Sequence, residues 1–147
     1  MALEFTDEFR EKIRAEIQNV ETALKNLKEA EERQEQSVIE LAATATFIHN
    51  IYNGIENILI QIFKSQDIKI PITSTWHKDL LDTAAFRGII SNEMSNDLYD
   101  YLAFRHFFVH AYAFMLEEPQ MAPLSKNISD VWTRFLSEIG FQQKQTE

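Results

Sequence analysis

The sequence contains no cysteine among its 147 residues. This absence excludes disulfide bonds, thiolate metal sites and cysteine nucleophiles together. Proteins of a reducing compartment fold without disulfides, so the composition favours a cytoplasmic protein. Any catalytic or metal-binding chemistry must therefore use histidine, carboxylate, hydroxyl or basic side chains.

Turn-forming residues and long apolar runs are also scarce. Only three glycines and three prolines are present, whereas a strand-rich domain of this length needs more turn residues. No uncharged apolar stretch approaches the roughly 18 residues of a membrane span, and the N-terminus alternates acidic and apolar residues, unlike a signal peptide. We therefore expect an all-α protein with no membrane association.

Basic residues are outnumbered by acidic ones. Lys and Arg total 14 against 23 Asp and Glu, which gives a formal net charge of −9. An electrostatic field of this sign argues against a protein that coats nucleic acid non-specifically. Binding to a polyanion would have to rely on a local group of cations.

Apolar residues recur at helical spacing along most of the chain, and the helical segments are separated by proline, glycine and Ser/Thr clusters. The expected helices span 6–32 with Thr6 as N-cap, 35–67, a short segment 76–88, 91–115, and about 125–139. The second has the widest apolar arc and should be the central helix. We expect a single all-α domain over 1–147, an antiparallel bundle of four main helices plus a short connecting one, with 1–5 and 142–147 frayed.

Several residues interrupt the apolar pattern of the predicted central helix. Gly54 is expected to mark a close approach to another helix. His49, Asn50, Asn53 and Asn57 form a polar seam on this otherwise apolar segment. These side chains are either ordinary polar groups with satisfied hydrogen bonds or the lining of a cleft, and their spacing is compatible with both.

The aromatic-rich segment 101–114 contains strongly polar groups within a helix that otherwise has core character. These groups are Arg105, His106, His110 and Tyr112. At about 100° per residue, the two histidines are neighbours one turn apart, and Arg105 and Tyr112 share a stripe two turns apart. Burying this side within one protomer would remove an arginine and two imidazoles from water, so we expect it to line a cleft or a subunit interface.

These side chains suit phosphodiester cleavage without a metal ion. Arginine is always charged, and histidine titrates near neutrality. A histidine removes the proton from a ribose 2′-hydroxyl or delivers one to the leaving oxygen, while Arg105 stabilises the charge that builds on the phosphorane. The substrate is expected to be RNA, because DNA lacks that hydroxyl. The chemistry implies no cofactor.

The motif resembles that of a known family. The segment from Arg105 to Tyr112 matches the signature of the HepT-like toxins in the HEPN superfamily of helical ribonucleases. In this signature an arginine is followed, after four residues, by a histidine, and then, after any one residue, by a tyrosine. The full combination of Arg, His and Tyr is expected by chance about 0.005 times in a sequence of this composition. The likeness extends over about 38–116 and includes Trp76 and the segment 88–91.

The resemblance implies a HEPN-like fold and a metal-independent endoribonuclease that is the toxin of a toxin–antitoxin pair. It implies that Arg105 and His110 are catalytic, with His106 at the variable polar position after the arginine. In the family two protomers bring their motifs together at a symmetric cleft, which implies a homodimer. The antitoxin is typically a minimal nucleotidyltransferase of the MntA type that adenylylates the motif tyrosine, here Tyr112, whose nucleotidyl phosphate would lie on the Arg105 stripe.

Two other interpretations are compatible with the same residues. A non-catalytic helical partner of a nucleotidyltransferase, or a simple dimerisation module, explains the bundle, the acidity and the tyrosine without ribonuclease activity. His106 and His110 also have the i, i+4 spacing of a metal pair, completed by His49 or His77. Neither motif histidine has a carboxylate at helical spacing, which argues against this metal site.

The phenylalanines near the motif and the nearby cations complete the candidate residues. We expect the phenylalanines to pack in the core or in a dimer interface: Phe104, Phe107, Phe108 and Phe114. Binding to RNA would need further local positive charge. By sequence proximity, the candidates are Lys64, Lys78 and Arg87.

Overall fold

The computed structural model describes residues 5–70 and 72–141, and within them every regular element is helical. The elements are α1 (Asp7–Glu31), α2 (Val38–Ser65), α3 (Trp76–Phe86), α4 (Asn92–His110), the 3₁₀ turn η1 (Ala113–Met115) and α5 (Glu118–Ile139). The prediction of four main helices plus a short connecting one is confirmed. No helix in these two ranges is long and apolar enough to cross a membrane.

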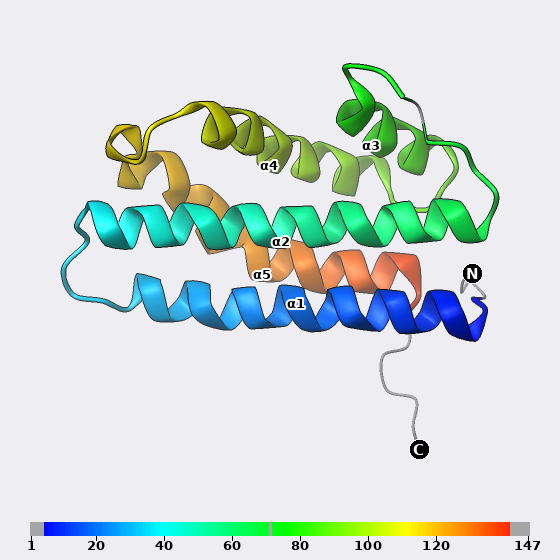
Figure 1. Cartoon of the computed structure of the whole chain (residues 1–147), viewed down its shortest axis with the longest axis horizontal. Helices are drawn as coiled ribbons and strands as arrows, with labels where there is room; N and C mark the ends of the chain where they lie inside the picture. Colours follow the sequence, from blue (N-terminus) through cyan, green and yellow to red (C-terminus); the bar gives the residue numbers. More distant parts are fainter. Residues whose placement is uncertain (1–4, 71, 142–147) are drawn as a thin grey trace.

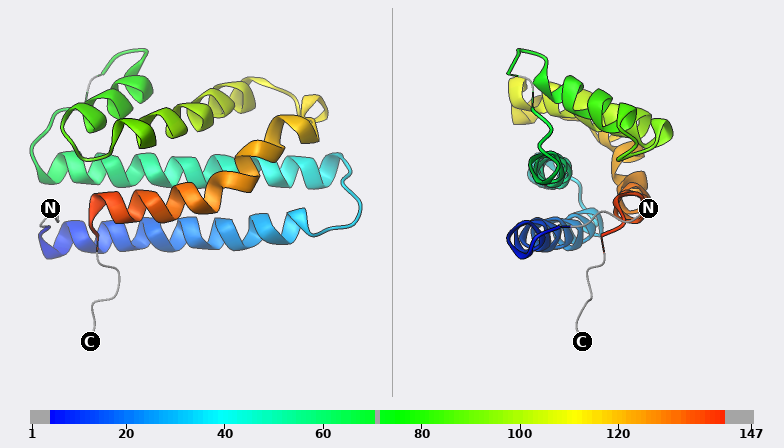
Figure 2. Two further views of the ribbon diagram at one scale, coloured as in Figure 1. Left: turned by 180° about the vertical axis from the view of Figure 1, so that it is seen from behind. Right: turned by 90° about the vertical axis from the view of Figure 1, so that its right-hand side faces the viewer.

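The helix α2 lies at the centre of the bundle (Figure 1). It runs antiparallel to α1 on one side, whereas α3 and α4 cover the opposite side and α5 lies against a third (Figures 1 and 2). Contact on three sides explains the wide apolar arc that the sequence shows over this helix. Its largest fully buried side chains are Ile48, Ile51, Tyr52, Ile55, Ile58, Leu59, Ile62 and Phe63.

Polar side chains cap three of the helices at their N-termini. Thr6 and Ser91 each accept a hydrogen bond from the backbone N–H three residues further on, at 3.4 and 3.0 Å. Ser37 and Glu40 form a reciprocal capping box at the start of α2. Each such cap stabilises its helix by about 1 kcal/mol, and the predicted N-cap at Thr6 is confirmed.

The helices α1 and α2 approach each other closely at Gly54. A Cβ placed on Gly54 would lie 2.2 Å from Val20 Cγ2. Valine is branched at Cβ and has little rotamer freedom in a helix, so it cannot easily move aside. The expectation that this glycine marks a close helix contact is therefore confirmed.

The prediction that the fourth main helix continues to Met115 is wrong. The helix α4 ends at His110, and Ala111 adopts an extended backbone with φ −102° and ψ 156°. His110 Nδ1 donates a hydrogen bond to the backbone carbonyl of His106 at 2.8 Å. The bond lies in the last turn of α4, directly before the chain leaves the helical conformation at Ala111.

The prediction that the last helix begins near Ser125 is also wrong, because α5 begins at Glu118. Pro119 occupies the first turn, where a missing N–H is tolerated, and Pro123 lies inside the helix. Gln120 accepts a hydrogen bond from the backbone N–H of Glu117 at 2.8 Å, and the two residues form a capping box. The segment with two prolines is therefore the start of a helix and not a break.

Residues at the two ends of the described chain pack together. The rings of Phe5 and Phe141 lie 6.0 Å apart between centroids, and Phe5 packs against the core. The other residues for which the sequence predicts fraying, 1–4 and 142–147, lie outside the described residues.

Candidate functional site

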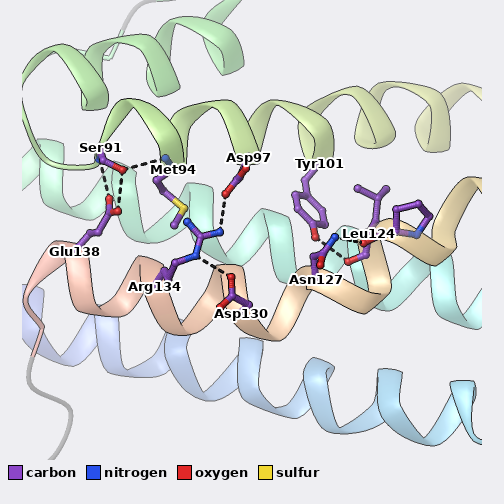
Figure 3. A network of polar contacts seen from close by, with 10 residues as sticks. Ser91, Met94, Asp97, Tyr101, Leu124, Asn127, Asp130, Arg134 and Glu138 are labelled. Carbon is purple, nitrogen blue, oxygen red and sulfur yellow. Dashed lines mark hydrogen bonds and ion pairs between the residues drawn. The ribbon is translucent and has the colours of Figure 1, made fainter.

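The helix α4 carries the polar motif, and its first half is attached to α5 by polar contacts (Figure 3). These contacts hold the first half of α4 against α5, and the motif lies in the second half of the same helix. The backbone N–H and the hydroxyl of Ser91 donate hydrogen bonds to Glu138 at 2.7 and 2.8 Å. Arg134 donates to Asp97 at 2.6 Å, and the Tyr101 hydroxyl donates to the Leu124 carbonyl at 2.7 Å.

His106 and His110 lie side by side on the exposed face of α4, as their spacing predicts. Their ring centroids are 4.7 Å apart, and both residues are exposed. The hydrogen bond from His110 Nδ1 to the His106 carbonyl assigns a proton to Nδ1. In the neutral ring Nε2 then carries the lone pair, and Nε2 has no hydrogen-bond partner among the described residues.

Arg105 takes a different direction from the two histidines. It is half-buried, and its Nε is buried without a hydrogen-bond partner in the part of the chain that the structure describes. Its charge acts on the side chains of His49 and Tyr52 of α2, which places it on the inner flank of α4. Within residues 5–70 and 72–141, no hydrogen bond joins Arg105 to His110.

His49 of α2 lies beneath the motif. Its ring centroid is 5.0 Å from that of Phe108 on α4, and its Nε2 accepts a hydrogen bond from Asn53 at 3.1 Å. Burial, followed by the positive charge of Arg105, lowers the pKa of His49 below its ordinary value. The imidazole of His49 is therefore kept neutral next to the guanidinium.

The rest of the polar seam on α2 faces α1. Asn57 donates a hydrogen bond to Glu16 at 3.3 Å. Asn50, Asn53 and Asn57 line a groove of about 290 Å³ between α1 and α2. The seam thus divides between ordinary hydrogen-bonded groups and the wall of a shallow groove, while His49 packs against Phe108 of the motif-bearing helix.

The buried Glu56 and the half-buried His77 form a polar pair that sequence reasoning did not single out. Glu56 is 3% exposed, and both of its carboxylate oxygens lie 2.9 Å from His77 Nδ1. The His77 ring stacks on Trp76 with centroids 3.7 Å apart. The detectable signal is a lone carboxylate inside the apolar run of α2, since a buried charge requires a partner.

Tyr112 lies beyond the end of α4, so the predicted stripe shared by Arg105 and Tyr112 does not exist. Tyr112 is 69% exposed, and its ring is parallel within 7° to that of Phe114, with centroids 5.6 Å apart. Phe114 is 76% exposed and does not belong to the core, so of the two expected locations only a dimer interface remains open for it. Core packing is confirmed for Phe104, which is buried, and Phe107 and Phe108 pack partly buried against the core.

The cations chosen by sequence proximity are not gathered around the motif. Lys78 Nζ is 2.9 Å from a carboxylate oxygen of Asp82, so its charge is already paired. Lys64, in the last turn of α2, and Arg87, at the end of α3, are exposed. The helix α3 and the C-terminal end of α2 lie at the end of the bundle opposite to the C-terminal end of α4 (Figure 1).

The histidines do not assemble into a metal site in the described ranges. No group of three His, Cys, Asp or Glu side chains there is arranged to hold an ion. His77 is bonded to Glu56, and His49 packs against Phe108. Neither of them completes the pair formed by His106 and His110.

Comparison with known proteins assigns the chain to a family. A family model described as HepT-like protein matches residues 43–145 of the chain. The chain belongs to the HepT-like family. No curated protein and no solved structure matches it.

The family match covers most of the bundle and the whole polar motif. It begins within α2 and continues through α5, whereas the likeness noted in the sequence ends at about residue 116. The resemblance to HepT-like HEPN proteins is thus confirmed. Membership implies a toxin–antitoxin context for this HepT-like protein, and α1 lies outside the match.

Proposed function

We propose that this HepT-like protein is a metal-independent endoribonuclease, the toxin of a toxin–antitoxin pair, with Arg105, His110 and His106 as its catalytic residues. The observation that carries the proposal is the state of His110. Its Nδ1 is fixed to the His106 carbonyl, and its Nε2 is left free on an exposed surface. A histidine in this arrangement is oriented to exchange protons with a ligand.

The reaction follows from these groups. His110 Nε2 takes the proton of a ribose 2′-hydroxyl, and the oxygen attacks the adjacent phosphorus. The bond to the 5′-oxygen breaks, a second imidazole donates a proton to that oxygen, and a 2′,3′-cyclic phosphate remains. His106 supplies such an imidazole, and Arg105 stabilises the extra negative charge on the phosphorane.

A homodimer resolves the different directions of Arg105 and His110. Within one protomer the guanidinium turns towards α2, and the two imidazoles are exposed. Two-fold symmetry places the same surface of two copies face to face, so that a cleft receives groups from both motifs. We infer that the complete RNA site is formed by two protomers.

Tyr112 is the proposed site of adenylylation by a nucleotidyltransferase antitoxin. Its position outside α4 and its 69% exposure make the hydroxyl accessible to a second enzyme. Mass spectrometry after co-expression with the neighbouring nucleotidyltransferase should find one added AMP, which Tyr112→Phe abolishes. Tyr99→Phe is the matched control, because the Tyr99 hydroxyl is bonded to Asp82. An unmodified wild-type protein would refute this part of the proposal.

The ribonuclease activity is tested by RNA cleavage in the presence of EDTA. Arg105→Ala and His110→Ala should abolish cleavage while the dimer persists, and His106→Ala should reduce it. Arg87→Ala, at an exposed arginine far along the chain from the motif, should leave it unchanged. Continued cleavage by His110→Ala would eliminate the acid–base role. A stable complex with the nucleotidyltransferase and no cleavage at any ratio would support a non-catalytic partner instead.

A further inference from the structure

Two aromatic rings stand exposed just beyond the end of α4. Tyr112 and Phe114 follow His110 by two and four residues, and their rings are parallel within 7°. The two rings form a contiguous exposed apolar pair close to His110, and contiguous exposed apolar groups commonly mark interaction sites. Within the described chain the two rings pack against each other, and both residues remain largely exposed, at 69% and 76%.

The charges near this pair favour an uncharged flat ligand. Glu117 and Glu118 follow the rings closely in sequence and are exposed, and the whole chain carries a net charge of −9. Phosphate groups are repelled by such a surface, whereas a nucleobase is neutral and presents a π face. Proteins that bind single strands commonly stack bases on exposed aromatic rings.

We propose that Tyr112 and Phe114 form a stacking platform for one unpaired base of the RNA, an inference that rests on the proposed function for the identity of the ligand. The platform supplies affinity that the acidic surface cannot supply through phosphate contacts. Because it follows His110 by only a few residues, it also selects which phosphodiester lies at the imidazole. Phe114 is then a residue that binds and positions the substrate without taking part in proton transfer.

The platform also gives adenylylation of Tyr112 a direct physical effect. The modification tethers an adenosine to the hydroxyl of one of the two rings. The tethered adenine has the same kind of π face as an RNA base. Because the tether keeps it close to the two rings, it stacks on the platform in place of the RNA base. Modified protein therefore fails to stack RNA even if the imidazoles remain free.

The test uses the His110→Ala protein, in which the proposed catalytic base is removed so that bound RNA should stay intact, and single-stranded RNA carrying 2-aminopurine at one position at a time. Stacking quenches the fluorescence of this base. We expect quenching at one position, and a rise in Kd of about 5- to 100-fold with loss of quenching in Phe114→Ala. Phe114→Leu should behave like Phe114→Ala, because leucine has no π face. Phe86→Ala removes an even more exposed ring on α3 and should change nothing.

The outcomes separate this inference from the proposed function. Unchanged binding and quenching in Phe114→Ala, or full binding by Phe114→Leu, would overturn the platform. A change of oligomeric state in Phe114→Ala, or loss of a bound protein partner with intact RNA binding, would overturn it in favour of a protein interface. Phe114-dependent quenching together with no cleavage by the wild-type protein would support the platform and refute the ribonuclease. Absence of any RNA binding would refute both.

Discussion

Glu56 is the most deeply buried charged side chain among the described residues, and its surroundings explain why α3 is needed above α2. Its carboxylate contacts His77 through both oxygens, and the phenol of Tyr52 lies close by. Burial, followed by the negative charge of Glu56, raises the pKa of Tyr52. A group of this kind ties α3 to α2, because a buried carboxylate is tolerated only with a fixed partner.

Removing His77 should therefore destabilise the fold more than neutralising Glu56. We expect His77→Ala to lower the free energy of unfolding by about 2 kcal/mol, because the carboxylate stays buried without its partner. In a Glu56→Gln background the same substitution should cost clearly less. Urea denaturation of the two single variants and the double variant measures this coupling. Equal costs in both backgrounds would show that the contact contributes nothing.

His49 should give the protein a characteristic pH dependence. Its pKa is lowered in the folded state from an ordinary value of 6.5 by burial and by Arg105. Below pH 6.5 the unfolded chain takes up a proton that the folded protein refuses, so this contribution to stability is complete above 6.5 and decreases as the pH falls towards the folded pKa.

Replacing His49 by glutamine removes this contribution and keeps a polar partner for Asn53. We expect the free energy of unfolding to decrease less between about pH 7.5 and about pH 5.5 in His49→Gln than in the wild type. The other titrating groups are common to both proteins, so the difference isolates His49. Parallel pH profiles for the two proteins would contradict the assignment.

At the scale of helices, apolar spacing predicts the existence and type of each element but not where each helix ends. The central helix and its close contact at Gly54 follow from the local pattern alone. The end of α4 does not, because the residues after His110 are good helix formers and no glycine or proline follows directly. There the imidazole bonds to the His106 carbonyl, and the chain turns away.

The same distinction applies to the candidate site. The contact between His106 and His110 is predictable, since residues four apart on a helix always neighbour one another. The inward direction of Arg105 depends on which flank of α4 packs on α2, and the pairing of Glu56 with His77 joins residues from two helices. Such contacts depend on tertiary packing that local spacing does not contain.

The contact between α1 and α2 should be sensitive to a single methyl group. Alanine at Gly54 gains about 1 kcal/mol in helix propensity, but its Cβ would overlap Val20, so we expect a net loss of about 1–2 kcal/mol. In the Val20→Ala background, Gly54→Ala should become neutral or stabilising. Thermal unfolding of both single variants and the double variant measures the sign change. A Gly54→Ala protein more stable than wild type would show that the helices separate freely.

At the scale of the whole molecule, the net charge of −9 conflicts with a polyanionic substrate. Of the candidate cations, Arg105 lies on the motif itself, Lys78 is paired with Asp82, and the exposed Arg87 lies at the end of α3, far from the C-terminal end of α4 (Figure 1). A ribonuclease of this composition must bind its RNA through a few phosphate contacts and through interactions that do not depend on charge. This balance is measurable, because each phosphate neutralised by a protein cation releases counterions.

The affinity of His110→Ala for single-stranded RNA should therefore depend only weakly on salt. If the two Arg105 side chains of the proposed dimer make the phosphate contacts, log K should fall with log salt with a slope of about −1.4, and repulsion from the acidic surface makes it shallower. Fluorescence anisotropy between about 50 and 200 mM NaCl measures the slope. A slope near −4 would require other cations, such as Lys25, Lys28 and Lys126 in the groove of about 560 Å³ between α1 and α5. In that case the positive charge would attract RNA to the groove between α1 and α5, and the RNA would have to extend from that groove to the motif.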